Sequence, residues 1–222
     1  IDQNTLLVKD NPQIIGSLIF AYDTKHASNE WHKNKFLLEA SAFIIKGVCQ
    51  HKKLLDHRRI FPIIVESYPL FVKHLPELRS IYEPYFYSLA EFFAKRLVDR
   101  QDLTEFTSAN IGYATNHLAV ALKGVTLYFS RCSKKCGSLT GVDKKFLLKF
   151  LDRFMTYMHP AGYWAECDGP CLHYNSLTAV CLMSVAEELG VLKLYVNNFK
   201  VVADFHTFVT MPDGCYLDLM DG

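Results

Sequence analysis

Apolar residues recur at three- and four-residue steps along much of this chain, which places them on one face of an α-helix. The clearest case follows Asp143, a residue type that often caps helix N-termini. Its predicted apolar face comprises Phe146, Leu147, Phe150, Leu151, Phe154, Met155 and Met158. A helix from Ser28 to Gln50 is predicted with an apolar face at Trp31, Phe36, Leu37, Ala40, Phe43, Ile44 and Val48. The spacing therefore predicts a mostly helical chain.

Prolines and glycines divide this pattern. Pro62, Pro69, Pro76 and Pro84 favour short helices and turns, and Pro84 is expected at the first position of a helix over residues 84–100. Further helices are predicted over residues 108–131, 175–189 and 194–209. Residues 159–172 contain two prolines and two glycines, so we expect a long loop there.

The end of the chain changes character. Residues 211–214, Met-Pro-Asp-Gly, predict a turn, and Cys215–Leu217 then begins to alternate like a strand. The sequence thus predicts an all-α fold with the start of a β segment at the C-terminus. We expect one helical domain over residues 1–210, followed over residues 211–222 by the start of a connection to a β domain.

Composition narrows the functional classes. The 222 residues include 24 lysines and arginines against 23 aspartates and glutamates, so no overall charge attracts nucleic acid or an anionic membrane. No apolar run approaches the roughly 18–20 residues of a membrane helix. The first residues carry no recognisable targeting signal. An acidic ligand would therefore need a local patch of donors.

The seven cysteines include two pairs with three intervening residues, Cys132/Cys136 and Cys167/Cys171. An odd count in a chain of this length is not typical of a secreted disulfide scaffold. Three states remain open: thiols, one or two local disulfides, or a zinc ion held by all four residues. The zinc site is the least favoured, because zinc-binding pairs usually belong to a small metal-dependent module. No cofactor is expected.

Two polar elements could carry chemistry. Asn116-His117 interrupts a predicted apolar helix and shares a face with Tyr113; the alternative is a histidine that bonds a neighbouring carbonyl, or a solvated face. The second element is the loop from Gly162 to Asn175, which contains two carboxylates, a histidine, two tyrosines and a tryptophan. Aromatic rings can stack on sugars and carboxylates can bind hydroxyls, but such a loop can also simply seal a core.

The order of these elements resembles a known family. Asn116-His117 on a helix is followed, after one helical hairpin, by a G-Y-W-x-E-x-D-G-P loop that ends at Tyr174. This resembles the α/α-toroid polysaccharide lyases, particularly the heparinase II/III-like and alginate-lyase families. The resemblance covers residues 108–222 and implies an incomplete (α/α) toroid of helical hairpins whose tail leads toward a β-sandwich. The spacer between Glu166 and Tyr174 is longer than the family's.

The resemblance also implies a reaction, β-elimination on a uronate-containing glycan. Asn116 and His117 would bind the uronate carboxylate, and Tyr174 would take the C5 proton or protonate the leaving oxygen. The remaining implied substrate-binding residues are Tyr113, Tyr163, Trp164, Glu166 and His173. The implied partner is an acidic polysaccharide, with no nucleic acid or membrane, and the implied location is periplasmic or secreted.

Two alternatives remain beside this hypothesis. One is a glycoside hydrolase on the same scaffold, with Glu166 and either Asp168 or Asp218 as acid and base. The other is a glycan-binding module without catalysis. The product distinguishes the enzymes, because only elimination leaves an unsaturated uronate that absorbs ultraviolet light.

Overall fold

The structure is a computed structural model that describes residues 11–50, 57–100, 115–166 and 169–210. These residues are mostly helical, as the spacing predicts, and their contacts divide the chain into two compact units. Unit 1 comprises residues 1–92 and 127–138, and unit 2 comprises residues 93–126 and 139–222. Across the described ranges, no helix combines the length and the apolar character that a membrane span needs.

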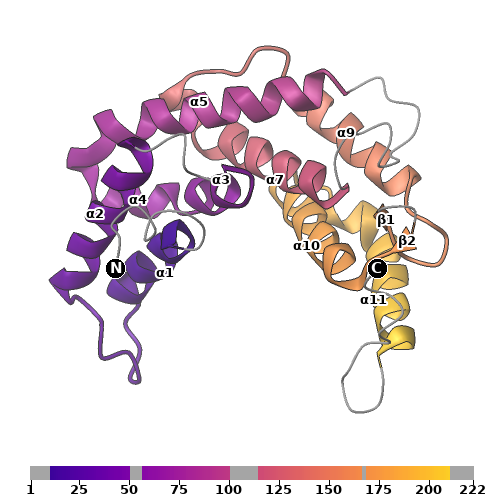
Figure 1. Cartoon of the computed structure of the whole chain (residues 1–222), viewed down its shortest axis with the longest axis horizontal. Helices are drawn as coiled ribbons and strands as arrows, with labels where there is room; N and C mark the ends of the chain where they lie inside the picture. The colour runs from indigo at the N-terminus through magenta and orange to yellow at the C-terminus, as the bar shows by residue number, and fades with distance from the viewer. Residues whose placement is uncertain (1–10, 51–56, 101–114, 167–168, 211–222) are drawn as a thin grey trace. The chain divides into compact units, whose positions relative to one another are not determined.

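Unit 1 is built from helices, most of them short (Figure 1). Its core is largely aromatic. Its elements are α1 (Asn11–Asp23), α2 (Lys35–Gln50), α3 (His57–Glu66), α4 (Tyr68–His74), a 3₁₀ turn (Pro76–Leu78), α5 (Arg79–Val98) up to Phe92, α7 (Thr115–Arg131) from Leu127, and α8 (Ser133–Cys136). Helix α1 packs against α2, α3 and α4. Four rings of α4 and α5 contact one another in the core: Tyr68, Phe71, Tyr82 and Phe86.

The prolines of unit 1 act partly as predicted. Short helices do occupy residues 57–78, but the start expected at Pro84 is wrong, because α5 begins at Arg79 and contains Pro84. A proline inside a helix removes one backbone hydrogen bond and costs about 3 kcal/mol. The residues around it, Tyr82, Tyr85 and Phe86, are fully buried, so apolar burial offsets that cost.

Helix α2 begins later than predicted and buries only part of the predicted face, at Leu37 and Val48. It starts at Lys35, and the residues before it form turns. The buried face is Leu37, Ser41, Ile45 and Val48. Two members of the predicted apolar face, Phe36 and Phe43, are instead 63% and 71% exposed. The packing of α1 determines which side of α2 is covered, and local spacing contains no information about that partner.

Unit 2 contains the loop predicted over residues 159–172 and the helix that follows Asp143 (Figure 1). Besides α5 from Phe93 and α7 up to Thr126, its elements are α9 (Lys144–Thr156), β1 (Ala165–Glu166), β2 (Gly169–Pro170), α10 (Leu172–Glu188), a 3₁₀ turn (Leu192–Tyr195) and α11 (Val196–Val209). Helix α10 packs against α9 and α11. Strands β1 and β2 pair antiparallel, with Ala165 opposite Pro170 and Glu166 opposite Gly169.

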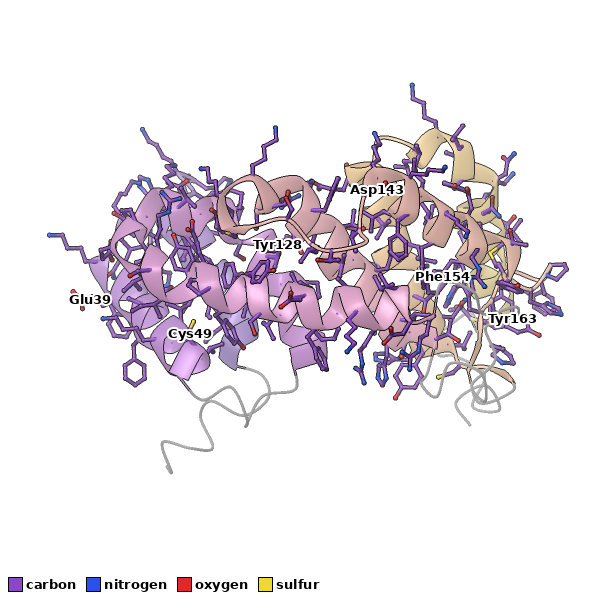
Figure 2. The ribbon with its side chains drawn as sticks, turned by 90° about the horizontal axis from the view of Figure 1, so that it is seen from above. Glu39, Cys49, Tyr128, Asp143, Phe154 and Tyr163 are labelled. Carbon is purple, nitrogen blue, oxygen red and sulfur yellow. The ribbon has the colours of Figure 1, made fainter. Side chains whose placement is uncertain are left out.

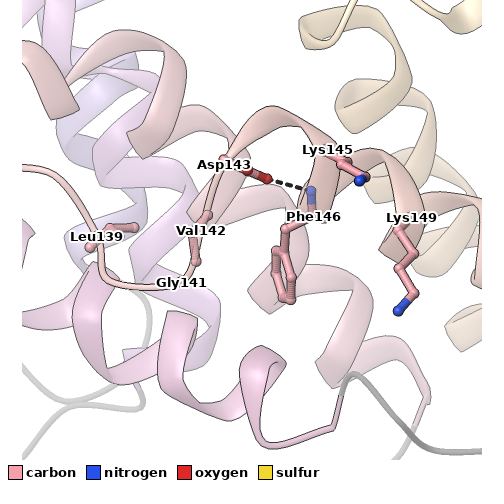
Figure 3. A pocket seen from close by; sticks show the side chains of 7 residues that line it. All are labelled: Leu139, Gly141, Val142, Asp143, Lys145, Phe146 and Lys149. Carbon is pink, nitrogen blue, oxygen red and sulfur yellow. Dashed lines mark hydrogen bonds between the residues drawn. The ribbon is translucent and has the colours of Figure 1, made fainter.

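The sequence prediction is most accurate at α9. The Asp143 side chain accepts a hydrogen bond of 2.7 Å from the backbone N–H of Phe146, which confirms the predicted cap (Figure 3). The predicted face is buried at Leu147, Phe150, Leu151, Phe154 and Met155. An open pocket of about 430 Å³ lies at the start of this helix, and the side chains of Lys145 and Lys149 form part of its lining.

Other predicted boundaries shift by a few residues. Helix α10 begins at Leu172 rather than 175, and α11 begins at Val196 after a 3₁₀ turn. Tyr174 therefore lies in the first turn of a helix rather than in a loop. The start of the helix expected at residue 108, the turn at 211–214 and the strand at 215–217 fall outside the described residues.

Candidate functional site

The Asn116-His117 element opens helix α7 and is tied to the loop after α9. Thr115, the first residue of α7, donates a hydrogen bond of 2.8 Å from Oγ1 to the backbone carbonyl of Ala165 in β1. Asn116 is 1% exposed, whereas His117 is half-buried. The two elements singled out in the sequence are thus joined directly within unit 2, and His117 is the more accessible of the pair.

The β-hairpin continues this connection to α10. Ala165, bonded to Thr115, pairs across the hairpin with Pro170, and α10 begins two residues later at Leu172. The first turns of α7 and α10 therefore adjoin the same two-stranded hairpin. The candidate residues His117 and Tyr174 therefore lie in the first turns of two helices that both begin next to this hairpin.

His173 and Tyr174 occupy the first turn of α10. Both are exposed, Tyr174 to 39%, and their rings contact edge to face with centroids 5.6 Å apart. An exposed hydroxyl beside an imidazole can exchange protons with a bound ligand. Of the other proposed residues, Tyr113 lies outside the described residues, and for Glu166 the structure describes the backbone of β1 alone.

The ring of Tyr163, labelled in Figure 2, contacts two other rings of unit 2. Its ring stacks on His159 with centroids 4.4 Å apart and also contacts Phe205 of α11 at 5.3 Å. The backbone N–H of His159 donates to the carbonyl of Tyr163, which closes the turn. The half-buried ring therefore anchors the loop to α11, and a ligand could reach only its remaining exposed surface.

Trp164 does not form the sugar platform that the resemblance implies. Its side chain is 1% exposed, and its indole N–H donates a hydrogen bond of 2.8 Å to the carbonyl of Phe154 in α9. A ring without exposed surface cannot stack on a ligand in this structure. Trp164 instead seals the core of unit 2, which is the alternative that the sequence left open for this loop.

Asn175, which sequence reasoning did not select, holds the loop in place. It is fully buried, and its Oδ1 accepts from the backbone N–H of Trp164 at 3.1 Å. Its Nδ2 lies 3.2 Å from the carbonyl of Gly162 and 3.1 Å from Nε2 of His206 in α11. The sequence did contain one signal for this role, because an asparagine is an unfavourable residue inside a helix. Asn175 thus joins the loop, α10 and α11.

These contacts determine which nitrogen of the His206 ring carries the proton. The two backbone partners fix the orientation of the Asn175 amide, so its second N–H points at Nε2 of His206, which must then act as an acceptor. A neutral ring with its proton on Nδ1 satisfies this requirement. Burial lowers the pKa of His206, which favours the same neutral form. The histidine therefore positions Asn175 rather than carrying charge.

Acidification should weaken this contact. The pKa of His206 is lower in the folded chain than its ordinary value of about 6.5, so its neutral form stabilises the fold fully above that pH. This contribution is lost as pH falls below about 6.5, because the unfolded chain takes up the proton first. We expect the difference in unfolding free energy between wild type and His206→Gln to shrink from pH 7.5 to pH 5, measured by urea unfolding. A difference independent of pH would contradict this assignment.

The cysteines that the structure describes are thiols. They are Cys49, Cys132, Cys136, Cys171 and Cys181. Cys132 and Cys136 belong to unit 1, Cys171 precedes α10 in unit 2, and Cys167 lies outside the described residues. Within the described ranges, no three histidine, cysteine or acidic side chains are grouped so that they could hold a metal ion.

Comparison with protein-family models, with curated proteins and with solved structures finds no match to this chain.

Proposed function

We propose that the chain is a polysaccharide lyase that cleaves a uronate-containing acidic glycan by β-elimination. The observation that supports this best is the hydrogen bond from Thr115 to Ala165, since it joins the Asn-His element to the loop that leads to Tyr174. The pattern of residues that resembles the toroid lyases therefore corresponds to neighbouring elements in space. The candidate site comprises the first turns of α7 and α10 with the β-hairpin.

We assign different roles to the candidate residues because their side chains differ in solvent exposure. His117 is half-buried and can donate a hydrogen bond to the uronate carboxylate, which makes the C5 proton more acidic. Tyr174 is exposed and is the proposed acid and base, with His173 as the donor or cation beside it. Asn116 is buried, so we do not assign it a contact with substrate.

The proposed reaction balances without a cofactor. Tyr174 removes the C5 proton, the electrons of that C–H bond form the C4–C5 double bond, and the C4–O4 bond breaks. The leaving oxygen takes up a proton, from Tyr174 or from water. The products are a new chain end and a 4,5-unsaturated uronate.

We propose further that these helices form part of an incomplete α/α toroid. Helix α10 packs against both of its chain neighbours, α9 and α11, as the helical hairpins of such a fold do. An experimental structure in which successive helices did not alternate between an inner and an outer ring would contradict this fold.

Ultraviolet absorbance tests the proposed reaction. We expect the wild-type chain to generate the absorbance of an unsaturated uronate from at least one of alginate, heparin, heparan sulfate, chondroitin sulfate, hyaluronan or ulvan. Tyr174→Phe should lower the rate about 10²–10⁴-fold, because it removes the acid and base. His117→Ala should lower it about 10²–10³-fold, because the carboxylate loses a donor.

Matched variants outside the site keep this test specific. Tyr22→Phe and His26→Ala make the same chemical changes in unit 1, where we expect full activity. Glycan shortening without absorbance would indicate hydrolysis instead of elimination. Glycan binding without any cleavage, unchanged in Tyr174→Phe, would indicate a binding module.

A further inference from the structure

A pair of cysteines lies one helical turn apart where α7 meets α8, in unit 1 and apart from the proposed site. Cys132 is the residue before α8, and Cys136 is its last residue. The backbone N–H of Cys136 donates to the carbonyl of Cys132 at 2.8 Å, the bond of one α-helical turn. Such a turn separates the Cα atoms by about 6 Å. This separation falls within the range of roughly 4.4–6.8 Å that a disulfide spans.

The two thiols share a hydrogen bond but differ in their environments. Cys132 is fully buried, whereas Cys136 is partly exposed. The hydrogen bond between the side chains, with Cys132 as donor, raises the pKa of Cys132, and burial raises it further. The same hydrogen bond lowers the pKa of Cys136. The thiol with the lowered pKa is therefore the one that solvent can reach, which is the arrangement of a reactive cysteine with a second thiol behind it.

Cys136 ends a chain of hydrogen bonds between side chains of unit 1. Its thiol donates to the Tyr68 hydroxyl at 3.8 Å. Tyr68 donates to the Glu83 carboxylate at 2.8 Å, and Nε of Arg79 donates to the same oxygen at 2.8 Å. Arg79 thus offsets the charge of Glu83, which would otherwise oppose a thiolate nearby.

Helix α8 ends directly after Cys136. Gly137 follows Cys136 with φ of 118°, a conformation that side-chain-bearing residues rarely adopt, so the helix ends there. Its carbonyl accepts a hydrogen bond of 2.9 Å from the hydroxyl of Tyr128, labelled in Figure 2. A movement of Cys136 toward Cys132 would therefore change the backbone at the end of α8 and not inside a helix.

We propose that Cys132 and Cys136 form a redox-active dithiol that reduces low-molecular-weight disulfides, with Cys136 as the attacking residue and Cys132 as the resolving one. The Cys136 thiolate attacks one sulfur of R–S–S–R, so a mixed disulfide forms and RS⁻ leaves and takes a proton. Cys132 then attacks the Cys136 sulfur and expels the second RS⁻, which takes up the proton of Cys132. Two electrons pass from the protein to the small disulfide, which yields two RSH.

Oxidised glutathione is the probe for this reaction. Trypsin cleaves after Arg131, Lys134, Lys135 and Lys144, so a Cys132–Cys136 disulfide would link the peptide 132–134 to the peptide 136–144. We expect the full chain to lose two thiols first and to give this linked pair by mass spectrometry. Dithiothreitol should reverse it. Oxidation of another cysteine pair with no linked 132–134 and 136–144 would overturn the proposal.

Two serine variants test the order of attack. Cys132→Ser should retain one glutathione on Cys136, because the resolving thiol is gone. Cys136→Ser should leave Cys132 reduced, because that thiol is buried. Glutathione on Cys132 in the second variant would overturn the assigned roles.

A measurement on the wild type does not depend on how these variants fold. At pH 7 we expect iodoacetamide to label Cys136 at least about tenfold faster than Cys132, followed peptide by peptide. Equal labelling rates would contradict the proposed division between an attacking and a resolving thiol.

Discussion

Replacing Trp164 by alanine is expected to destabilise unit 2 by about 3–5 kcal/mol, the range for removing a large buried aromatic side chain. The indole is fully buried, and its N–H supplies a hydrogen bond to the carbonyl of Phe154. The variant therefore loses apolar burial, leaves a cavity and removes a donor from a helix carbonyl. Urea unfolding followed by circular dichroism measures the change.

Trp31 provides the matched control. It lies in the turn between α1 and α2 and is 51% exposed, so Trp31→Ala should change stability by less than about 1 kcal/mol. Trp164→Phe should fall between the two, because it keeps most of the ring volume and loses the hydrogen bond. Equal effects of Trp31→Ala and Trp164→Ala would contradict the position of Trp164 in the core.

Gly162→Ala should be the second strongly destabilising substitution. A Cβ at this position would lie 2.3 Å from the carbonyl oxygen of Val201 and 3.1 Å from Cβ of Phe205, both in α11. The backbone φ of 96° adds a conformational penalty. Since backbone cannot yield as a side chain can, the loop must move away from α11. We expect a loss of about 3 kcal/mol or more, the sum of overpacking and backbone strain.

Gly190→Ala separates these two causes. Gly190 also has a positive φ, 76°, but no atom lies within 4 Å of the position of its Cβ. Its substitution should therefore show the backbone penalty alone, about 1–2 kcal/mol. Parallel urea unfolding of the two variants gives the packing contribution by difference. Losses of equal size would show that Gly162 does not pack closely on α11.

The comparison of α9 with α2 shows what sequence can predict about this fold. Around α9, the cap at Asp143 and the apolar spacing agree, and the structure confirms both. In α2, large apolar residues lie on two sides, so periodicity alone could not distinguish Phe36 and Phe43 from the face that α1 covers. Local signals specify a helix, but the choice of the buried face depends on a partner from elsewhere in the chain.

The candidate site shows the same division. The sequence identified Asn116, His117 and the loop before Tyr174 as unusual, and the hydrogen bond from Thr115 to Ala165 joins these elements. It could not distinguish the exposed Tyr174 from the buried Trp164, because both are aromatic residues within one loop pattern. It also missed Asn175, whose importance comes from simultaneous contacts with two segments distant in the sequence.

The positions of the two tryptophans have a spectroscopic consequence. The chain contains only Trp31 and Trp164, one in each unit, one exposed and one buried. Emission from the folded chain should combine a red-shifted signal that iodide quenches with a blue-shifted signal that iodide does not reach. Each unit thus carries its own intrinsic fluorophore, so one titration can show whether the two units unfold together or in sequence.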